Sequence, residues 1–495
     1  MAGYPVVFVD SGGLPVTYSS DGNGWPIEEA ASGLPVTEVA SGGLPVTEGV
    51  RVVTPLQFGA TGSMDDDDSA AIQAALDSGH RVLIDRFYRH LNDIIWPAYA
   101  TVQFYGEPEQ VGFVADMGTG LSHQIGGGVR IYGRGTVKSL AYPASALAND
   151  ENWDIYCRGI RLTGGDVYIQ GLCMEDLAGG LDAADQSGIQ VDYLRGERIR
   201  TRYGWGAVFH AAGSLGGTIE MAEAVDCDRF LEPEDGSKHW TFNGGSGLRI
   251  YPPGYTGQPA DGSGATDLNI GSYPLSAHSH PGTGACEDIV YRNFLIEQSL
   301  GAIRTERSGG SDANDLPRDI TFDTIEVKSP KRVNRSAFGG NAAINFTPVH
   351  LQGVGQVVKN CRLTGTGESQ LGRIIHTLGG SDDTLIDNFI ADADSYHGRF
   401  AQFAGVNSTL RNSTIGRQAG SSTAVLIDVD ANGAKILNNQ LNGPRYHSVL
   451  YDFASGTSGC ERKGNSYTPP PSNPPSAIVN YNGTTVDETG GNDDA

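Results

Sequence analysis

Short stretches in which apolar and polar residues alternate follow one another from about residue 100 to residue 465. Alternation with a period of two predicts strands with one buried face, and the scarcity of helical patterns between them argues against a βαβ fold. The clearest stretches are residues 128–132, 166–170, 188–191, 288–291, 319–323, 356–358, 384–387, 424–427 and 434–437. In the second half they often recur after about 20 to 30 residues. A sandwich, a propeller and a parallel solenoid all fit recurring short strands. The lack of a strict blade motif and the Asn-containing turns favour the solenoid, so we expect an all-β parallel β-helix.

One early segment has the periodicity of a helix instead. Between residues 69 and 79 the apolar stripe is formed by Ile72, Ala75 and Leu76. Asp68 is placed to cap the N-terminus of this helix and Gly79 to end it. The run of four aspartates before the stripe lacks the spacing and the final Glu of an EF-hand, so we interpret it as helix-terminal charge and not as a metal loop. Residues 81–84 predict a short buried strand.

The first fifty residues contain a repeat of Gly, a large apolar residue, Pro and a β-branched residue. Its five copies begin at Gly3, Gly13, Gly24, Gly33 and Gly43. Proline fixes φ and lacks a backbone donor, so this segment cannot form a helix or a central strand. It is either a flexible linker or an extended ribbon that lies along a partner, and we favour the second. The docking residues would then be Pro5, Pro15, Trp25, Pro26, Leu34, Pro35, Leu44 and Pro45.

These patterns divide the chain into four parts. We expect an attachment segment at residues 1–50, an entry and cap motif at 51–115, a solenoid body at 116–465 and a Pro-rich extended tail at 466–495. Within the body, residues 232–285 are rich in Gly, Pro and aromatic residues and predict a long loop insertion.

Composition narrows the class of protein. Glycine makes up 69 of 495 residues, which fits many tight turns, and no Gly-X-Y period indicates collagen. The net charge of −24 argues against nucleic acid as a partner.

Six scattered cysteines with no C-x-x-C pair predict buried free thiols. No standard secretory signal and no run of 18 apolar residues occurs, so we expect neither conventional secretion nor membrane insertion.

A resemblance rests on residues 58–77. Phe58-Gly59-Ala60-Thr61-Gly62, the following aspartates and Ser69-Ala70-Ala71-Ile72-Gln73-Ala74-Ala75 resemble the entry motif of the pectate-lyase-3 type of right-handed parallel β-helix, a family that includes many bacteriophage tailspikes. This chain departs from the motif at Ser63-Met64, where Asp-Gly is usual, and at Ser69, where Thr is usual.

The resemblance implies a right-handed β-helix, a homotrimer and a place in a virion, most naturally the tail. Such a protein would be assembled in the host cytoplasm and released by lysis. Because the family includes lyases, hydrolases and non-catalytic binders, it implies no particular chemistry.

Candidate catalytic residues are carboxylates in turns. Polysaccharide cleavage needs two carboxyl groups at the glycosidic bond or a base beside a uronate. The candidates are Asp182, Asp185, Asp226 and Asp228, although turn formation is the more ordinary role of aspartates in a solenoid. If residues 226–228 form a strand, Asp226 and Asp228 share one face. Gln190 stands where a polygalacturonase would have a second aspartate, and no Gly-His-Gly occurs.

Candidate sugar-binding residues are aromatic or imidazole side chains, which have an apolar face and a polar edge. They are Tyr203, Trp205, His239 and Trp240, with packing beneath a loop as the alternative. His278 and His280 would lie on one face of a strand, but the sequence offers no third ligand. We therefore predict no metal and no cofactor.

The leading hypothesis is a phage tailspike or tail-fibre protein that binds host surface polysaccharide and, in its stronger form, depolymerises it. The alternative is a non-catalytic structural or adhesive virion component. The N-terminal repeat and the missing signal disfavour a third reading, a secreted pectinolytic enzyme. The expected partners are two further copies of the chain, other virion proteins through residues 1–50 and the host polysaccharide.

Overall fold

The fold is taken from a computed structural model of the chain. It describes residues 51–117, 120–140, 158–200, 206–250, 273–299, 301–307, 312–329, 348–364, 373–392, 399–416, 425–442, 449–469, 475, 477–489 and 491–492. Before residue 51 it describes only the backbone of 7–9, 15–17, 38–39 and 45–46.

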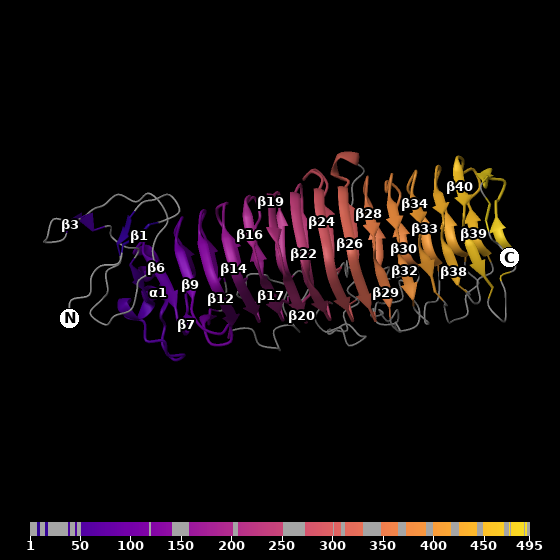
Figure 1. The fold of residues 1–495 in the computed structure, drawn as a ribbon. Coiled ribbons are helices and arrows are strands. Elements are labelled where there is room, and N and C mark those ends of the chain that lie inside the picture. The colour runs from indigo at the N-terminus through magenta and orange to yellow at the C-terminus, as the bar shows by residue number, and fades with distance from the viewer. Residues whose placement is uncertain are drawn as a thin grey trace.

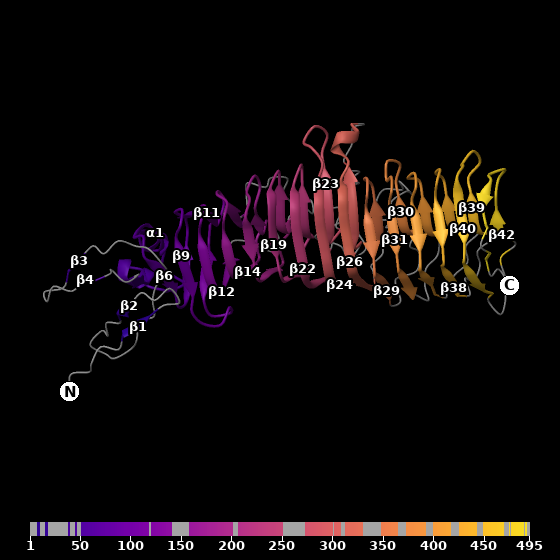
Figure 2. The ribbon, with the colours of Figure 1, turned by 45° about the horizontal axis from the view of Figure 1, so that its top comes forward.

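The body of the protein is a right-handed parallel β-helix, as the sequence predicts. Its strands stack along one axis from the N-terminal to the C-terminal end (Figures 1 and 2). Over the described residues they form one sheet of 25 strands and one of 14 strands, and every pairing within these two sheets is parallel.

The larger sheet contains β5 (Val52–Val53), β6 (Arg81–Ile84), β7 (Phe87–His90), β9 (Thr101–Phe104), β10 (Gly112–Ala115), β12 (Arg130–Ser139), β14 (Tyr168–Glu175), β16 (Ile189–Val191), β17 (Leu194–Glu197), β19 (Leu215–Ile219), β20 (Ala222–Val225), β22 (Lys238–Leu248), β24 (Glu287–Glu297), β26 (Arg318–Lys328), β28 (Val357–Lys359), β29 (Arg362–Thr364), β31 (Leu385–Asp387), β32 (Ile390–Asp392), β34 (Thr409–Arg411), β35 (Thr414–Ile415), β37 (Lys435–Leu437), β38 (Gln440–Asn442), β40 (Cys460–Lys463), β41 (Ser466–Thr468) and β43 (Val486–Asp487).

The smaller sheet contains β8 (Ile94–Trp96), β11 (His123–Ile125), β13 (Ile160–Leu162), β15 (Leu181–Asp182), β18 (Ala207–Ala212), β21 (Arg229–Glu234), β23 (Leu275–Ser279), β25 (Ile303–Arg307), β27 (Val349–Leu351), β30 (Arg373–Thr377), β33 (Arg399–Phe403), β36 (Val425–Val429), β39 (Val449–Phe453) and β42 (Ala477–Asn480).

The interior is a continuous apolar column in which like side chains stack from rung to rung. Phe242, Tyr291 and Phe322 occupy paired positions of β22, β24 and β26, and each neighbouring pair of ring centroids is 4.9 Å apart. This distance matches the spacing of about 4.7–4.9 Å between paired strands. The five cysteines at positions 173, 227, 286, 361 and 460 are buried and free, which confirms that prediction for the described part of the chain.

The corners of the coil explain the abundance of Asn and Asp in turns. Asn360, Asn388, Asn412 and Asn438 all have φ between 53° and 55° and follow one another at the same corner of successive rungs. A left-handed backbone is unfavourable for most residues and is tolerated best by Gly, Asn and Asp. The turn chemistry that favoured a solenoid is therefore a repeated backbone requirement.

The N-terminal end is covered by α1 (Ser69–Asp77), which follows the 3₁₀-helix η1 (Pro55–Phe58). Its stripe of Ile72, Ala75 and Leu76 is buried against the first rungs, as predicted. Asp68 occupies the N-cap position, but its carboxylate accepts from the backbone N–H groups of Thr61 and Gly62 at 2.8 and 3.1 Å instead of capping the helix. A second 3₁₀-helix, η4 (Ala313–Asp315), precedes β26. Over the described residues, α1 is the longest helix, and none is long and apolar enough to cross a bilayer.

The N-terminal repeat is not a single extended ribbon where its backbone is described. β1 (Val7–Val9) pairs antiparallel with β2 (Pro15–Thr17), and β3 (Glu38–Val39) pairs antiparallel with β4 (Pro45–Val46). In both pairs the Pro of the repeat opens the second strand and lies opposite a Val. Of the predicted docking residues, only the backbones of Pro15 and Pro45 fall within the described residues.

Two predicted boundaries differ from the strands observed. β22 and β23 lie within residues 232–285, where the sequence predicts an insertion, and both belong to the body. At the other end, β42 and β43 pair with β39 and β40, so the coil continues beyond residue 465. Loop-like composition misled the prediction because the rungs themselves turn on Gly, Pro and Asn.

The buried side-chain amides of Asn439 and Asn465 form a ladder of hydrogen bonds inside the C-terminal rungs. The Asn439 side chain accepts from the Ser413 N–H at 2.9 Å and donates to the Leu410 carbonyl at 3.1 Å. The Asn439 N–H in turn donates to the Asn465 side chain at 2.9 Å. Backbone groups that the corner leaves without a strand partner are thus satisfied in the interior.

We predict that Asn439→Ala lowers the free energy of unfolding by about 1–3 kcal/mol, because the buried Ser413 N–H loses its acceptor. Equilibrium urea denaturation measures the change. Gln440→Ala, at the exposed next position, should change it by less than about 0.5 kcal/mol. Equal effects of the two substitutions would contradict the structural role of the ladder.

Candidate functional site

The outward face of the smaller sheet carries a row of polar side chains, which we call the polar row. Its members are Gln124, Arg161, Asp182, His210, Glu232, Ser276, Arg304, His350, His376, Gln402, Asp428, Asp452 and Asn480. Each belongs to a different strand, and the neighbouring residues on those strands point into the core. The polar row runs along almost the whole coil.

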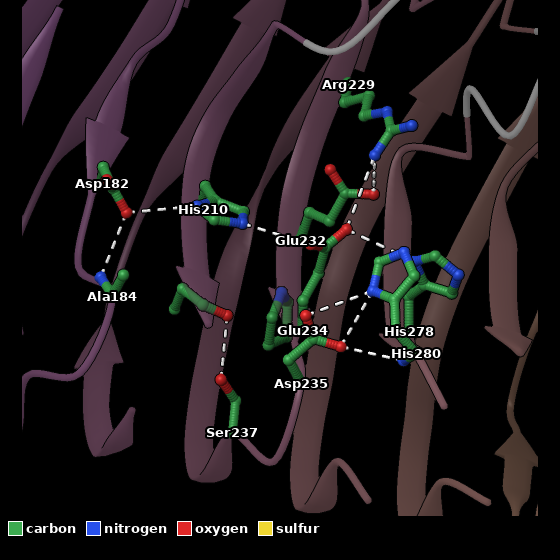
Figure 3. Close-up of polar contacts among 12 residues, drawn as sticks. Asp182, Ala184, His210, Arg229, Glu232, Glu234, Asp235, Ser237, His278 and His280 are labelled. Carbon is green, nitrogen blue, oxygen red and sulfur yellow. Dashed lines mark hydrogen bonds and ion pairs between the residues drawn. The ribbon is translucent and has the colours of Figure 1, made fainter. Parts of the chain in front are cut away.

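The densest part of the polar row is centred on His210 of β18. Its Nδ1 lies 3.1 Å from Asp182 Oδ1 on β15, and its Nε2 lies 3.3 Å from Glu234 Oε2 on β21. Figure 3 shows the imidazole between the two carboxylates. One side chain therefore joins three adjacent strands.

The two carboxylates keep this imidazole protonated. Burial lowers the pKa of His210, but the hydrogen bonds and charges of Asp182 and Glu234 outweigh it and raise the pKa to about 10. For the carboxyl groups of Asp182 and Glu234, burial acts in the opposite direction and raises the pKa. The hydrogen bonds and charge of His210 outweigh burial in both groups and lower the pKa, and the pKa of Glu234 lies well below its usual range. Neither carboxyl group is thus a proton donor at neutral pH.

Glu234 also contacts the next strand. Its Oε1 lies 3.3 Å from His278 Nδ1 on β23 and 3.7 Å from the Arg229 guanidinium, which in turn pairs with Glu232. Arg229, Glu232, Glu234 and His278 are all less than 9% exposed. This cluster of ionic groups is withdrawn from water.

Of the predicted catalytic residues, only Asp182 belongs to this cluster. Asp185 lies in the exposed turn after β15 with a left-handed backbone. Asp226 and Asp228 lie in the connection between β20 and β21 and not on a strand, so they do not share a strand face. The structure does not bring the four candidates together.

The surroundings of Asp226 and Asp228 are those of a turn. Asp226 has a φ of 55° and forms a two-pronged ion pair with Arg249, with both distances 2.6 Å. The hydrogen bonds from Arg249 are the main cause of its lowered pKa. Asp228 is fully buried and accepts from the Gly206 N–H at 3.3 Å. These contacts match the turn-forming interpretation that the sequence left open.

The predicted sugar-binding residues fall into three groups. Tyr203 and Trp205 lie outside the described residues. His239 is exposed near the start of β22, with its Nδ1 2.9 Å from Asp288. The prediction for Trp240 is wrong, because its ring is fully buried in the core and its Nε1 donates to Ser214 Oγ at 2.7 Å. No sugar on the surface can stack on it.

His210, Glu232 and Glu234 were not predicted from the sequence. His210 interrupts an apolar stretch between Phe209 and Ala211, which is a signal for an outward polar position. Its partners are 28 residues earlier and 24 residues later, so only strand register reveals the contacts. Register also gives His278 and His280 an acidic neighbour, Glu234.

A separate carboxylate pair lies on the larger sheet. Glu175 of β14 and Glu197 of β17 occupy directly paired positions. Glu197 lies 3.0 Å from Arg195 and also pairs with Arg198. Burial, and then the charge of Glu197, raises the pKa of Glu175. Two carboxyl groups thus lie at directly paired positions of neighbouring strands, outside the polar row.

Comparisons with known proteins define the fold only. No protein-family model matches the chain, and no curated protein matches it in sequence. Two solved structures of bacteriophage phi29 gene product 12 share the fold. The pre-mature form has a TM-score of 0.55 and 12% identity over 84% of this chain and 54% of the other. The N-terminal fragment has a TM-score of 0.56 and 12% identity over 87% and 72%.

PfbA, a surface adhesin of Streptococcus pneumoniae, also has this fold. Its TM-score is 0.50, with 11% identity over 82% of this chain and 93% of the adhesin. This chain spans about half the length of the pre-mature phi29 protein. A parallel β-helix is therefore the shared class, and identities this low leave the function to the residues themselves.

We predict that the His210 imidazole stays protonated up to about pH 10. Because its pKa is raised in the folded state, its stabilising effect is complete below the unfolded value near 6.5 and is lost as the pH rises through about 10. NMR of labelled histidine measures the titration. Glu234→Gln should lower the midpoint by removing one carboxylate, whereas a wild-type midpoint near 6.5 would contradict the bridging geometry.

Proposed function

We propose that this chain is a surface component of a phage particle that binds host surface polysaccharide along the polar row. The observation that carries the proposal is the row itself, in which thirteen adjacent strands carry one polar side chain each at the same register position. Glu232, Ser276, Arg304 and Asp428 are buried, so binding falls to the accessible members on either side of them. Folding a β-helix does not require such a row, since turns and the apolar column already stabilise the coil.

The shape of the polar row suits a linear polymer. Strands about 4.8 Å apart give a row of roughly 58 Å, much longer than a small-molecule pocket. Several members, including Arg161, His350 and His376, are partly or fully accessible. They offer hydrogen-bond donors at regular intervals, which complements the hydroxyl and carboxylate groups of a surface glycan.

The placement in a phage particle has independent support. The fold is that of a phage gene product and of a bacterial surface adhesin, and the N-terminal repeat offers regularly spaced attachment points. In this proposal residues 1–50 bind other virion proteins, and three copies assemble side by side. A non-catalytic adhesive role is the form of the function that the polar row alone supports.

We predict that the double variant Arg161→Ala and His376→Ala weakens binding of extracted host capsule or lipopolysaccharide at least tenfold, or about 1.4 kcal/mol. The matched control is Arg411→Ala with His239→Ala, which removes the same residue types from β34 and β22 of the larger sheet. Calorimetry with the purified full chain measures both. Equal losses in the two variants would refute binding along the polar row.

A second candidate function is cleavage of the bound glycan at Glu175 and Glu197. Retaining glycosidases use two carboxyl groups about 5–5.5 Å apart, one protonated and one ionised. Neighbouring strands place paired residues about 4.8 Å apart. The raised pKa of Glu175 and the arginine contacts of Glu197 fit the acid and the nucleophile respectively.

If this second function holds, Glu175→Gln should reduce glycan cleavage by about 10²–10⁴-fold while leaving binding unchanged. New reducing ends and polymer length measure cleavage. Glu220→Gln, an exposed carboxyl group elsewhere on the chain, serves as the control. Wild-type protein that binds glycan without shortening it would reject cleavage and retain the adhesive role.

A further inference from the structure

A group of three metal-ligand types lies at the junction of β21 and β23. Glu234 and His278 occupy paired positions on these strands, and His280 lies two residues beyond His278. One ligand atom from each of the three lies within 4.8 Å of the other two. The imidazole centroids of His278 and His280 are 4.5 Å apart. Figure 3 shows both rings gathered at Glu234 and Asp235.

The distances suit a tetrahedral ion. With bonds of about 2.0–2.1 Å, two ligand atoms on a tetrahedral zinc ion lie about 3.3–3.4 Å apart. Glu234 Oε1 and His278 Nδ1 are already 3.3 Å apart. The third ligand atom lies within 4.8 Å of each of these two, so a shift of about 1.5 Å or less brings it to the spacing of a tetrahedral site.

The ring of His280 is held as metal-bound imidazoles commonly are. Its Nδ1 lies 2.9 and 3.1 Å from the two oxygens of Asp235, which leaves Nε2 for an ion. Asp235 is itself fixed by Thr283 Oγ1 at 2.8 Å and by the His280 N–H at 2.8 Å. A carboxylate behind a ligating histidine sets its tautomer and orientation.

The carboxylate ligand is fixed as well. His210 occupies Glu234 Oε2, so Oε1 faces His278. The nearby Arg229 is paired with Glu232 and also lies 3.7 Å from Glu234 Oε1. Two adjacent carboxylates, Glu234 and Asp235, therefore contribute negative charge beside two imidazoles. This arrangement favours a cation.

We propose that Glu234, His278 and His280 bind one divalent transition-metal ion, with Zn²⁺ the best match, and that Asp235 is the positioning residue. Two nitrogen ligands and one carboxylate select zinc over magnesium or calcium, which prefer oxygen. Three protein ligands leave a fourth position for water or an oxygen of a bound molecule. The site goes beyond the proposed function, because metal binding is expected with no glycan present.

The test uses zinc alone with the purified full chain. After removal of metal with a chelator, Zn²⁺ is added, and calorimetry and metal analysis after dialysis give the affinity and the amount retained. We expect one zinc per chain in the wild type, and at least a hundredfold weaker binding by His280→Ala. We expect a 10- to 100-fold loss for Asp235→Asn, which keeps all three ligands. His239→Ala removes an exposed histidine that also faces an aspartate, and should bind zinc as the wild type does.

Circular dichroism and thermal unfolding of the metal-free variants show whether each is folded. His280 is half exposed, so its substitution should leave the coil intact, and Asp235→Asn provides a second, milder change. No retained zinc in the wild type would overturn the proposal. So would equal losses in His239→Ala and His280→Ala, because adventitious binding to any surface histidine would then explain the result.

Discussion

The structure depends on one constraint, the in-register parallel pairing of each rung with the next. Among the described strands between the two ends of the coil, backbone groups pair with the rungs before and after, so a corner that turns in one rung has to turn in the same way in the next. Repeated left-handed corners at Asn360, Asn388, Asn412 and Asn438 follow from this requirement. So do the stacked rings of Phe242, Tyr291 and Phe322, because equal register brings like positions into contact.

The same constraint creates the surface chemistry. Residues about 25 positions apart in the chain become neighbours about 4.8 Å apart, and their charges interact across strands in place of along them. His210 shows the consequence, since neither Asp182 nor Glu234 is close to it in sequence, yet together they hold its proton. The buried ion pair of Arg229 and Glu232 stands beside them, so this part of the polar row is rigid as well as charged.

Sequence reasoning could reach the solenoid because alternation and turn residues are local signals. The cap helix was predictable for the same reason, since Ile72, Ala75 and Leu76 form their stripe within two turns. The site was not predictable, because it depends on which residue of one rung pairs with which residue of the next. Trp240 shows the opposite error. Its spacing of two from Phe242 is a core signal, but the aromatic and glycine content around it indicated a loop.

The left-handed asparagine corners also bear on how such a chain can change in length. Successive corners at residues 360, 388, 412 and 438 are 28, 24 and 26 residues apart. Loss of a single residue within a strand would turn the side chains that follow it in that strand to the opposite face. Duplication or deletion of a whole corner-to-corner unit preserves every register. The molecule can therefore be lengthened or shortened between its two ends by unequal exchange of whole rungs, and each exchange would move the polar row by one position without disturbing its order.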